Sequence, residues 1–225
     1  MVEIELPGKV LILGGRTGIG RAVADWCGEQ AIVWSRSTNG VDATDAESVR
    51  AATEEFLAEN GAPWALVHSV GDFDEQPLLE TSDDLYRHLL ENNLTSAFLA
   101  AKALVPSMVK AGRGRVIYFG AAGVGDATAK TRAPIYFAIK AGLLSMVRSL
   151  AKEIARSGVT VNMVSPGIIR HAVSHAESQD RMESKVPLGR SGTVEDLRSA
   201  IEMLLSEGSG YLTGEDIHVD GGLRL

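Results

Sequence analysis

Short apolar runs rich in Val and Ile alternate along the chain with longer segments in which apolar residues recur every three to four positions. The short runs suit strands buried on both faces, and the longer period is that of an amphipathic helix. The predicted strands are Lys9 to Leu13, Ala31 to Trp34, a short piece at Val41, Trp64 to His68, Arg115 to Phe119, Thr160 to Val164 and Ile217 to Val219. The predicted helices lie near 19–29, 45–59, 83–110, 134–157 and 194–206.

Strands that alternate with helices indicate stacked βαβ units, joined by right-handed crossovers. We therefore expect an α/β fold, with a doubly wound parallel sheet of about seven strands and helices on both faces. Ligands bind such a sheet beyond the carboxyl ends of its strands. The 225 residues, of which 45% are apolar, suit a single domain over residues 1–225.

The composition narrows the possible partners. The chain has 22 Lys and Arg against 29 Asp and Glu, a formal charge of −7, and it has no basic run interleaved with aromatic residues, so nucleic acid is not expected. Cys27 is the only cysteine, which excludes an internal disulfide. The acidic start Met1–Glu5 lacks the features of a signal peptide, and no apolar run approaches the length of a membrane span. We expect a cytoplasmic protein without a membrane partner.

A glycine-rich turn, Gly14-Gly15-Arg16-Thr17-Gly18-Ile19-Gly20, joins the first predicted strand to the first predicted helix. Glycines let a backbone turn tightly and approach a ligand closely, and a helix N-terminus favours a pyrophosphate group. We predict that Gly14, Arg16, Thr17, Gly18, Ile19 and Gly20 bind a dinucleotide. The alternative is that the glycines serve only the close packing of helix against strand.

The end of the second predicted strand bears on which dinucleotide binds. A site for NAD usually has an acidic residue there, which holds the ribose hydroxyls. This chain has Trp34-Ser35-Arg36-Ser37 instead. Arg36, with Arg16, suits the additional 2′-phosphate of NADP, so NADP(H) is favoured over NAD(H). The alternative is a solvated surface arginine at position 36.

Tyr136 and Lys140 are four residues apart in a predicted helix, and this spacing sets both side chains on one face. A tyrosine titrates near pH 10, and a neighbouring cation moves its pKa toward neutrality. Such a pair can transfer a proton to or from an oxygen, although the same spacing also arises in helices without a catalytic role.

Together, Gly14-x3-Gly18-x-Gly20, Asn93-Leu94-Thr95, Tyr136-x3-Lys140, Ser165-Pro166-Gly167 and Asp220-Gly221-Gly222 resemble the short-chain dehydrogenase/reductase family. The similarity covers essentially the whole chain, and the tail from Pro187 resembles that of 3-oxoacyl-acyl-carrier-protein reductases. The resemblance implies a compact Rossmann fold and the dimer or tetramer usual in that family.

The resemblance also implies roles for single residues. Tyr136 would protonate a carbonyl oxygen as hydride arrives from the nicotinamide. Lys140 would lower the pKa of Tyr136 and hold the nicotinamide ribose, and Asn93 would help hold a water of the proton relay. The remaining expected cofactor contacts are Asp42, Gly71, Pro166, Gly167 and Ile169. Asn93 could instead point at solvent or bond its own backbone, and Asp42 could be a turn or helix N-terminal residue.

One feature of the family is missing, the serine that polarises the substrate carbonyl. No serine occurs between Ser107 and Ser145, and the expected position falls on Ala121 or on Gly123, depending on the end from which it is counted. Losing one donor to an oxyanion costs on the order of 3 kcal/mol. Three explanations remain open: a substitute donor among Asp126, Thr128 and Thr131, a bound water, or the loss of catalysis.

Other features receive weaker assignments. His68 in His68-Ser69-Val70-Gly71 replaces an asparagine of the family and is expected to be a satisfied buried histidine. The polar stretch near 170–190 predicts a short substrate lid over an open pocket. His171 and His175 lie in it, but without a third ligand we assign no metal. An apolar stripe on the helix after Tyr136 favours an oligomer; it comprises Leu143, Leu144, Met146, Val147, Leu150, Ala151 and Ile154.

These observations predict an NADP(H)-dependent reductase that acts on the carbonyl of a small molecule or of a carrier-bound oxoacyl group. Two alternatives remain. One is a pteridine-type reductase that acts on an activated C=N system, because such enzymes resemble this chain in lacking the serine. The other is a dinucleotide-binding protein without turnover.

Overall fold

The computed structural model of the chain describes residues 5–126, 128–170 and 183–225. All strands of the described residues belong to one parallel sheet of six strands, in the order β2-β1-β3-β4-β5-β6. The strands are β1 Val10–Leu13, β2 Ala31–Trp34, β3 Ala65–His68, β4 Gly114–Phe119, β5 Val159–Pro166 and β6 Asp216–Val219. The order reverses between β1 and β3, so a ligand crevice is expected beyond their carboxyl ends.

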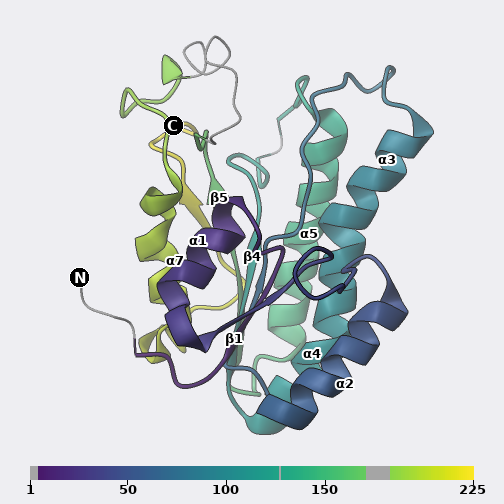
Figure 1. Cartoon of the computed structure of the whole chain (residues 1–225). Coiled ribbons are helices and arrows are strands. Elements are labelled where there is room, and N and C mark those ends of the chain that lie inside the picture. Colours follow the sequence, from purple (N-terminus) through teal and green to yellow (C-terminus); the bar gives the residue numbers. More distant parts are fainter. Residues whose placement is uncertain (1–4, 127, 171–182) are drawn as a thin grey trace.

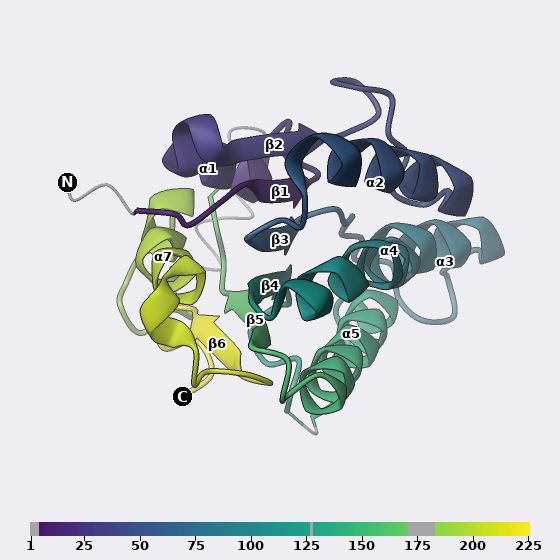
Figure 2. The same ribbon diagram turned by 90° about the horizontal axis from the view of Figure 1, so that it is seen from below.

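Helices cover both faces of this sheet, as Figure 2 shows: α1 and α7 lie on one face, and α2, α4 and α5 on the other. The helices are α1 Gly18–Cys27, α2 Ala46–Asn60, α3 Asp83–Leu90, α4 Ser96–Ala111, α5 Pro134–Glu153 and α7 Arg198–Leu205. A π-helical turn, Glu91–Thr95, joins α3 to α4, and short 3-10 turns occupy Gly28–Gln30, Val194–Leu197 and Glu207–Ser209. The predicted doubly wound α/β fold is confirmed.

Two details of the prediction are wrong. Val41 is not a strand, so the described sheet has six strands and not seven. Val41 is buried, but the chain turns immediately after it, because the Asp42 carboxylate accepts the backbone N–H of Thr44. The helix expected near 83–110 runs continuously over Asp83–Ala111, but it contains an unpredicted π-helical turn, which leaves the periodic pattern almost unchanged.

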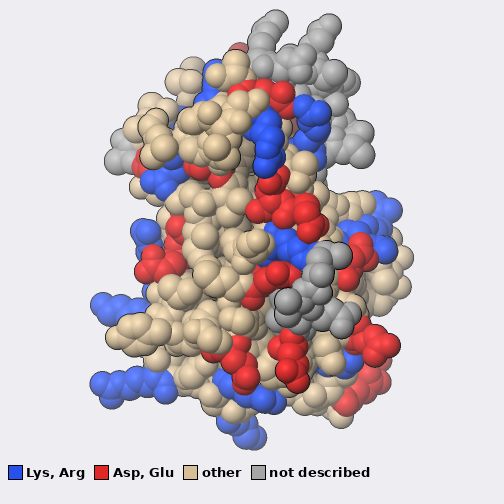
Figure 3. All heavy atoms as spheres, turned by 90° about the vertical axis from the view of Figure 1, so that its left-hand side faces the viewer, with Lys and Arg blue, Asp and Glu red and all other residues tan. Residues whose placement is uncertain are grey.

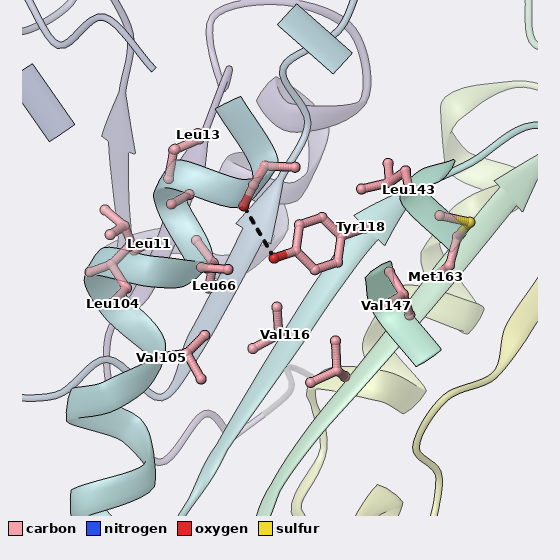
Figure 4. Packing of buried hydrophobic residues seen from close by; sticks show 14 of the residues in the cluster. Leu11, Leu13, Leu66, Leu104, Val105, Val116, Tyr118, Leu143, Val147 and Met163 are labelled. Atoms are coloured by element: carbon pink, nitrogen blue, oxygen red, sulfur yellow. Dashed lines mark hydrogen bonds between the residues drawn. The ribbon is translucent and has the colours of Figure 1, made fainter. Parts of the chain in front are cut away.

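The core lies on both sides of the sheet, because alternate strand residues face opposite layers. Figure 4 shows the side beneath α4 and α5, where Leu11, Leu13, Leu66 and Tyr118 meet the helices. The Tyr118 hydroxyl lies 3.5 Å from the Ala97 carbonyl oxygen, to which it donates. The opposite side has its own cluster, formed by the alternate strand residues together with α1 and α7; it includes Val10, Ile12, Val23, Val67, Ile117, Leu197 and Ile201.

The surface has two features that bear on partners. Acidic and basic side chains are intermixed on the face formed by α1 and α7, where Arg21 pairs with Asp25 and Arg198 with Glu202 (Figure 3). The continuous helical segment Asp83–Ala111 is long and apolar enough to cross a membrane by length and composition alone, a weak criterion that core helices also meet. Its apolar residues Leu104 and Met108 are fully buried against the sheet.

The apolar stripe on α5 is mostly covered by the chain itself. Leu143, Leu144, Val147 and Ala151 are buried, and the other three members of the stripe are half-buried. The width of the stripe therefore gives little support for a second subunit, and the oligomeric state stays a prediction.

Candidate active site

The strands end side by side, and the motifs of the sequence lie at this end. Leu13 at the end of β1 is in register with His68 at the end of β3, and His68 is in register with Tyr118 of β4. In Figure 1 the segments that follow β3, β4 and β5 all leave the sheet at its upper end. This arrangement is typical of a site built from loops on a rigid parallel sheet.

The glycine turn follows β1, and its glycines meet two separate demands. Gly14 has a φ of 86°, and a Cβ there would lie 2.8 Å from the backbone nitrogen of Val70. A Cβ at Gly20 would lie 2.1 Å from Ser69 Oγ. These two glycines therefore serve close packing of the turn against the segment after β3. Gly18 has a φ of 58° at the start of α1, a left-handed backbone conformation that favours glycine.

The N-terminus of α1 is suited to an anion. Thr17 occupies the capping position, but its side chain makes no capping hydrogen bond, and the first turn contains no acidic residue. The N–H groups of that turn consequently have no side-chain acceptor among the described residues. A pyrophosphate group would supply one, so the residues here fit a dinucleotide.

Arg16 and Arg36 are exposed near this turn, and within the described residues neither forms an ion pair or a hydrogen bond. Asp42 behaves as a turn residue. Its carboxylate accepts the Thr44 hydroxyl at 2.7 Å and the Thr44 N–H at 2.9 Å, and these bonds, with the charge of Arg36, hold its pKa below the usual value. An adenine contact from Asp42 stays a prediction.

Tyr136 and Lys140 lie together near the N-terminus of α5. Lys140 is 5% exposed, its Nζ donates to the Phe119 carbonyl at 2.9 Å, and the same atom lies 5.7 Å from the centre of the Tyr136 ring. Burial lowers the pKa of Lys140 to about 8. Burial also raises the pKa of Tyr136 to about 12. The expected lowering of the Tyr136 pKa by Lys140 is therefore wrong for this structure, in which burial is the cause of the shift.

Asn93 lies in the π-helical turn and points into the protein. Its side-chain amide donates to the carbonyls of Leu89 and Asp72, both at 2.9 Å, while its Oδ1 is buried without a partner. A Cβ at Gly71 would lie 2.5 Å from Oδ1 and 3.5 Å from Lys140 Nζ. Asn93 Oδ1 and Lys140 Nζ therefore both lie next to Gly71, which has no side chain to separate them. A water between the unpaired Oδ1 and the ammonium would satisfy this buried acceptor.

His68 is a satisfied buried side chain, as predicted. Its Nε2 lies 2.9 Å from Ser96 Oγ, and Ser96 donates to the Asn92 carbonyl at 2.6 Å, so Nε2 carries the proton and donates to Ser96. Burial and the charge of Lys140 lower the pKa of His68 to about 3. Ser96 has no sequence signal, because its role depends on the π-helical turn that places it.

The structure distinguishes the two positions for the missing serine. Gly123 has a φ of 81°, and a Cβ there would lie 2.7 Å from Lys130 Nζ and 3.0 Å from Asp126 Oδ2, so a serine does not fit. Ala121 follows β4 directly, and the next residue, Ala122, donates its N–H to the Pro166 carbonyl. Position 121 is free of this backbone strain, and its correspondence to the family's serine stays a prediction. Of the suggested substitutes, Thr128 and Thr131 are exposed, and Asp126 pairs with Arg224 at 3.3 Å.

The segment after β5 supplies the other predicted cofactor residues. Pro166 ends β5, and Gly167 is packed so tightly that a Cβ there would lie 2.7 Å from the Asp220 Cα. Ile169 forms a bridge with Gly192. The predicted lid near 170–190 is described only at Arg170 and over 183–190. His171 and His175 lie outside the described residues, and the described part of the chain contains no group of three potential metal ligands.

Sequence reasoning missed Phe73, in the segment between β3 and α3. Its ring centre lies 4.9 Å from that of Tyr136, and the two rings are almost perpendicular, at 87°. Glu75 in the same segment forms an ion pair with Arg132, in the segment before α5. The segment has no periodic pattern, so nothing in the sequence indicates these contacts.

The fold and this site define a class of protein, a dinucleotide-binding α/β oxidoreductase with a tyrosine and a lysine at the strand ends. The family model described as enoyl-(acyl carrier protein) reductase matches residues 20–224. The 3-oxoacyl-(acyl-carrier-protein) reductase of Salmonella typhimurium is 35% identical over 241 residues, covering 97% of this chain and 98% of the relative. The Escherichia coli protein of the same name is 34% identical with the same coverage, and that of Haemophilus influenzae is 33% identical, covering 98% and 100%.

The chain belongs to the short-chain dehydrogenase/reductase family. It is accordingly an NAD(P)-dependent oxidoreductase that acts on a carbonyl group or on the corresponding alcohol.

Proposed function

We propose that the protein uses NADP(H) to reduce the carbonyl of a small-molecule or carrier-bound oxoacyl substrate, with Tyr136 as the general acid. The observation that carries the proposal is the convergence of Tyr136, Lys140 and Asn93 beneath Gly71, beside an uncapped helix N-terminus. The printed names of the relatives, reductases of 3-oxoacyl groups on acyl-carrier protein, support an oxoacyl substrate.

The residues present fit a dinucleotide. The uncapped start of α1, from Thr17 to Gly20, would hold the pyrophosphate, and Arg16 and Arg36 would pair with a 2′-phosphate. Pro166, Gly167 and Ile169 would lie along the nicotinamide. When bound, this cofactor supplies the hydride.

The charge states support reduction. Tyr136 is protonated at neutral pH, which is the form that a general acid needs, and its raised pKa makes the charge of Lys140 important for stabilising the phenolate. Within the described residues, the Tyr136 hydroxyl makes no hydrogen bond, so it is available to a substrate oxygen. Lys140, with a pKa of about 8, is mostly charged at neutral pH and would stabilise the phenolate that remains after proton transfer. A water between Lys140 and Asn93 Oδ1 would then return the proton.

Tyr136→Phe tests this assignment. It removes the proton donor and keeps the ring that packs on Phe73, so we expect NADPH oxidation with an acetoacetyl thioester to fall by about a hundredfold or more. Affinity for NADPH, measured by fluorescence titration, should stay within about threefold of the wild type. Adding Phe137→Tyr to the Tyr136→Phe variant places a phenol at the neighbouring position, and this double variant should not regain activity. Turnover retained in Tyr136→Phe would refute the role.

A second candidate is a pteridine-type reductase acting on an activated C=N system. The observation that favours it is Ala121, because a more reactive substrate needs less help from a hydroxyl at that position. The same assay with a quinonoid dihydropterin separates the two functions. A value of kcat/KM for the pterin well above that for oxoacyl thioesters and diketones would replace the first proposal by the second. If none of these substrates is reduced although NADPH binds, a binding role without turnover becomes the better description.

The remaining expectations depend on the same family likeness. An acyl-carrier partner, a homodimer or homotetramer and a cytoplasmic location stay predictions.

A further inference from the structure

Four contacts hold the segment Asp72–Glu75 against the residues around it. The Asp72 carbonyl accepts a hydrogen bond from Asn93, and a carboxylate oxygen of Asp72 lies 2.8 Å from His88 Nε2. Phe73 packs its ring on Tyr136, and Glu75 pairs with Arg132 across 57 residues of sequence. In Figure 1 the segment runs from β3 toward α3, past the upper end of α5, where Tyr136 lies. These contacts fix the position of the segment relative to the phenol.

Phe73 remains 56% exposed although it contacts the phenol ring. Core packing does not explain this arrangement, because more than half of the side chain still faces water. An apolar group that covered the exposed part of the ring would be stabilised by the removal of that apolar surface from water. A rigidly held aromatic surface beside a proton donor is a suitable wall for the part of a substrate that flanks its carbonyl.

The charge of the same segment limits which substrates fit. Phe73, Asp74, Glu75, Gln76 and Pro77 line an open hollow of about 500 Å³. Glu75 is paired with Arg132, whereas Asp74 forms no ion pair among the described residues and only accepts the N–H of Gln76 at 2.8 Å. A substrate with a negative charge in this hollow would face an uncompensated carboxylate.

We propose that Phe73 is a specificity-determining residue, whose exposed ring accepts a flat apolar group next to the reacting carbonyl, while Asp74 disfavours an anionic substituent. The substrates preferred at this wall are neutral ketones with an aryl or similar planar group. The inference depends on the proposed function, because it places the carbonyl at the Tyr136 hydroxyl.

The experiment compares 1-phenyl-1,2-propanedione with 2,3-butanedione, which lacks the ring. In Phe73→Ala, the ratio of kcat/KM for the phenyl diketone to that for butanedione should fall by about tenfold or more, mainly through KM. Phe73→Trp should keep the ratio. Leu79→Ala is the matched control: it truncates a side chain that is 96% exposed further along the stretch between β3 and α3, and it should leave the ratio unchanged.

Asp74→Asn tests the electrostatic part with phenylglyoxylate, an anion that carries the same ring. This substitution should raise kcat/KM for phenylglyoxylate by about threefold to tenfold relative to the phenyl diketone. No relative gain would refute the role of Asp74.

The role of Phe73 is refuted if Phe73→Ala lowers kcat for both diketones equally, because the ring then only holds Tyr136 in place. It is also refuted if the ratio does not change. Binding of the phenyl diketone to the Tyr136→Phe protein, followed by saturation-transfer NMR, keeps the test separate from turnover. If the wild-type protein reduces no carbonyl, the proposed function fails. Loss of this binding when Phe73→Ala is added to the Tyr136→Phe protein would still support the role of Phe73 as a binding surface. Binding that is insensitive to Phe73 refutes it.

Discussion

Burial sets the charge of three side chains in the site. Lys140 is buried and its pKa falls to about 8, His68 is buried and its pKa falls to about 3, and the pKa of Tyr136 rises to about 12. For each group, the largest cause is the loss of solvation of the charged form. At neutral pH the site therefore holds a neutral imidazole, a protonated phenol and one ammonium.

His68 should make the folded protein sensitive to acid. Its pKa is about 3 in the folded protein and 6.5 for a solvated histidine, so between these values the unfolded chain binds a proton that the folded chain does not. The contribution of His68 to the free energy of unfolding is therefore at its maximum above pH 6.5. It decreases as the pH falls toward 3, by up to roughly 5 kcal/mol.

His68→Asn tests this linkage, because an amide still donates to Ser96 but does not titrate. Urea unfolding at several pH values should show a smaller loss of stability below pH 6.5 in the variant than in the wild type. Carboxylates such as Asp42 contribute equally to both curves. Parallel curves for the two proteins would contradict the assignment.

Arg36 should decide the choice between the two dinucleotides. Replacing it with alanine removes the proposed partner of the 2′-phosphate, so KM for NADPH should rise by about tenfold or more while KM for NADH changes little. Arg113→Ala, at an exposed arginine just before β4 and therefore away from the carboxyl ends of the strands, is the control. An equal change of KM for NADPH and NADH would show that Arg36 is a solvated surface residue, the alternative that the sequence left open.

Sequence reasoning located Tyr136 and Lys140, because their spacing on a helix is a local property. It gave the wrong direction for the Tyr136 pKa, because burial depends on tertiary packing. The family resemblance implied a water held by Asn93 in the proton relay, but the buried position of its Oδ1 opposite Lys140 follows from tertiary packing at the π-helical turn. Phe73 was missed because it contacts Tyr136 from an irregular segment.

Strand and helix boundaries were predictable to within about four residues wherever a buried face imposed a clear period. β2 begins and ends as predicted, and β1 begins one residue late. The strand predicted at Val41 was wrong because a single buried apolar residue shows no periodicity. The π-helical turn escaped detection because it alters the helical register only locally.

Arg115, at the start of β4, connects that strand with the end of α7. It is 4% exposed, donates to the carbonyls of Gly114, Ser206 and Glu207, and stacks over the Trp64 ring at 4.7 Å. Carbonyls at a helix end have no partner within the helix. The guanidinium supplies the donor for the Glu207 carbonyl and shares the Ser206 carbonyl with the Ser209 hydroxyl.

Arg115→Met should therefore destabilise the protein by about 3 kcal/mol, because it leaves the Glu207 carbonyl without its donor and removes the cation that stacks on Trp64. Urea unfolding measures the change, and Arg113→Ala, two residues away and exposed, is again the control, with an expected change below about 0.5 kcal/mol. NADPH affinity should not change, since Arg115 lies at the opposite end of the sheet from the site. A loss of less than about 1 kcal/mol would show that water replaces the guanidinium.

In the folded chain, α4 exposes apolar side chains to solvent. This exposed surface is better evidence for a second subunit than the apolar stripe of α5, which the chain itself covers. Phe98 is 49% exposed and Val109 is 36% exposed, while the outer face of α5 presents small exposed residues such as Ala141 and Gly142. Large side chains on one helix and small ones on another allow close approach of a second copy, and closed symmetric assembly is the usual outcome for such a face.

We therefore expect light scattering to give a dimer or a tetramer at micromolar concentration. Phe98→Glu should shift it to a smaller species, because two like charges would meet near the symmetry axis. Tyr211→Glu, at a fully exposed aromatic residue beyond α7, should leave the mass unchanged. A monomeric wild type would refute the assembly, and an unchanged mass in Phe98→Glu would place the contact elsewhere.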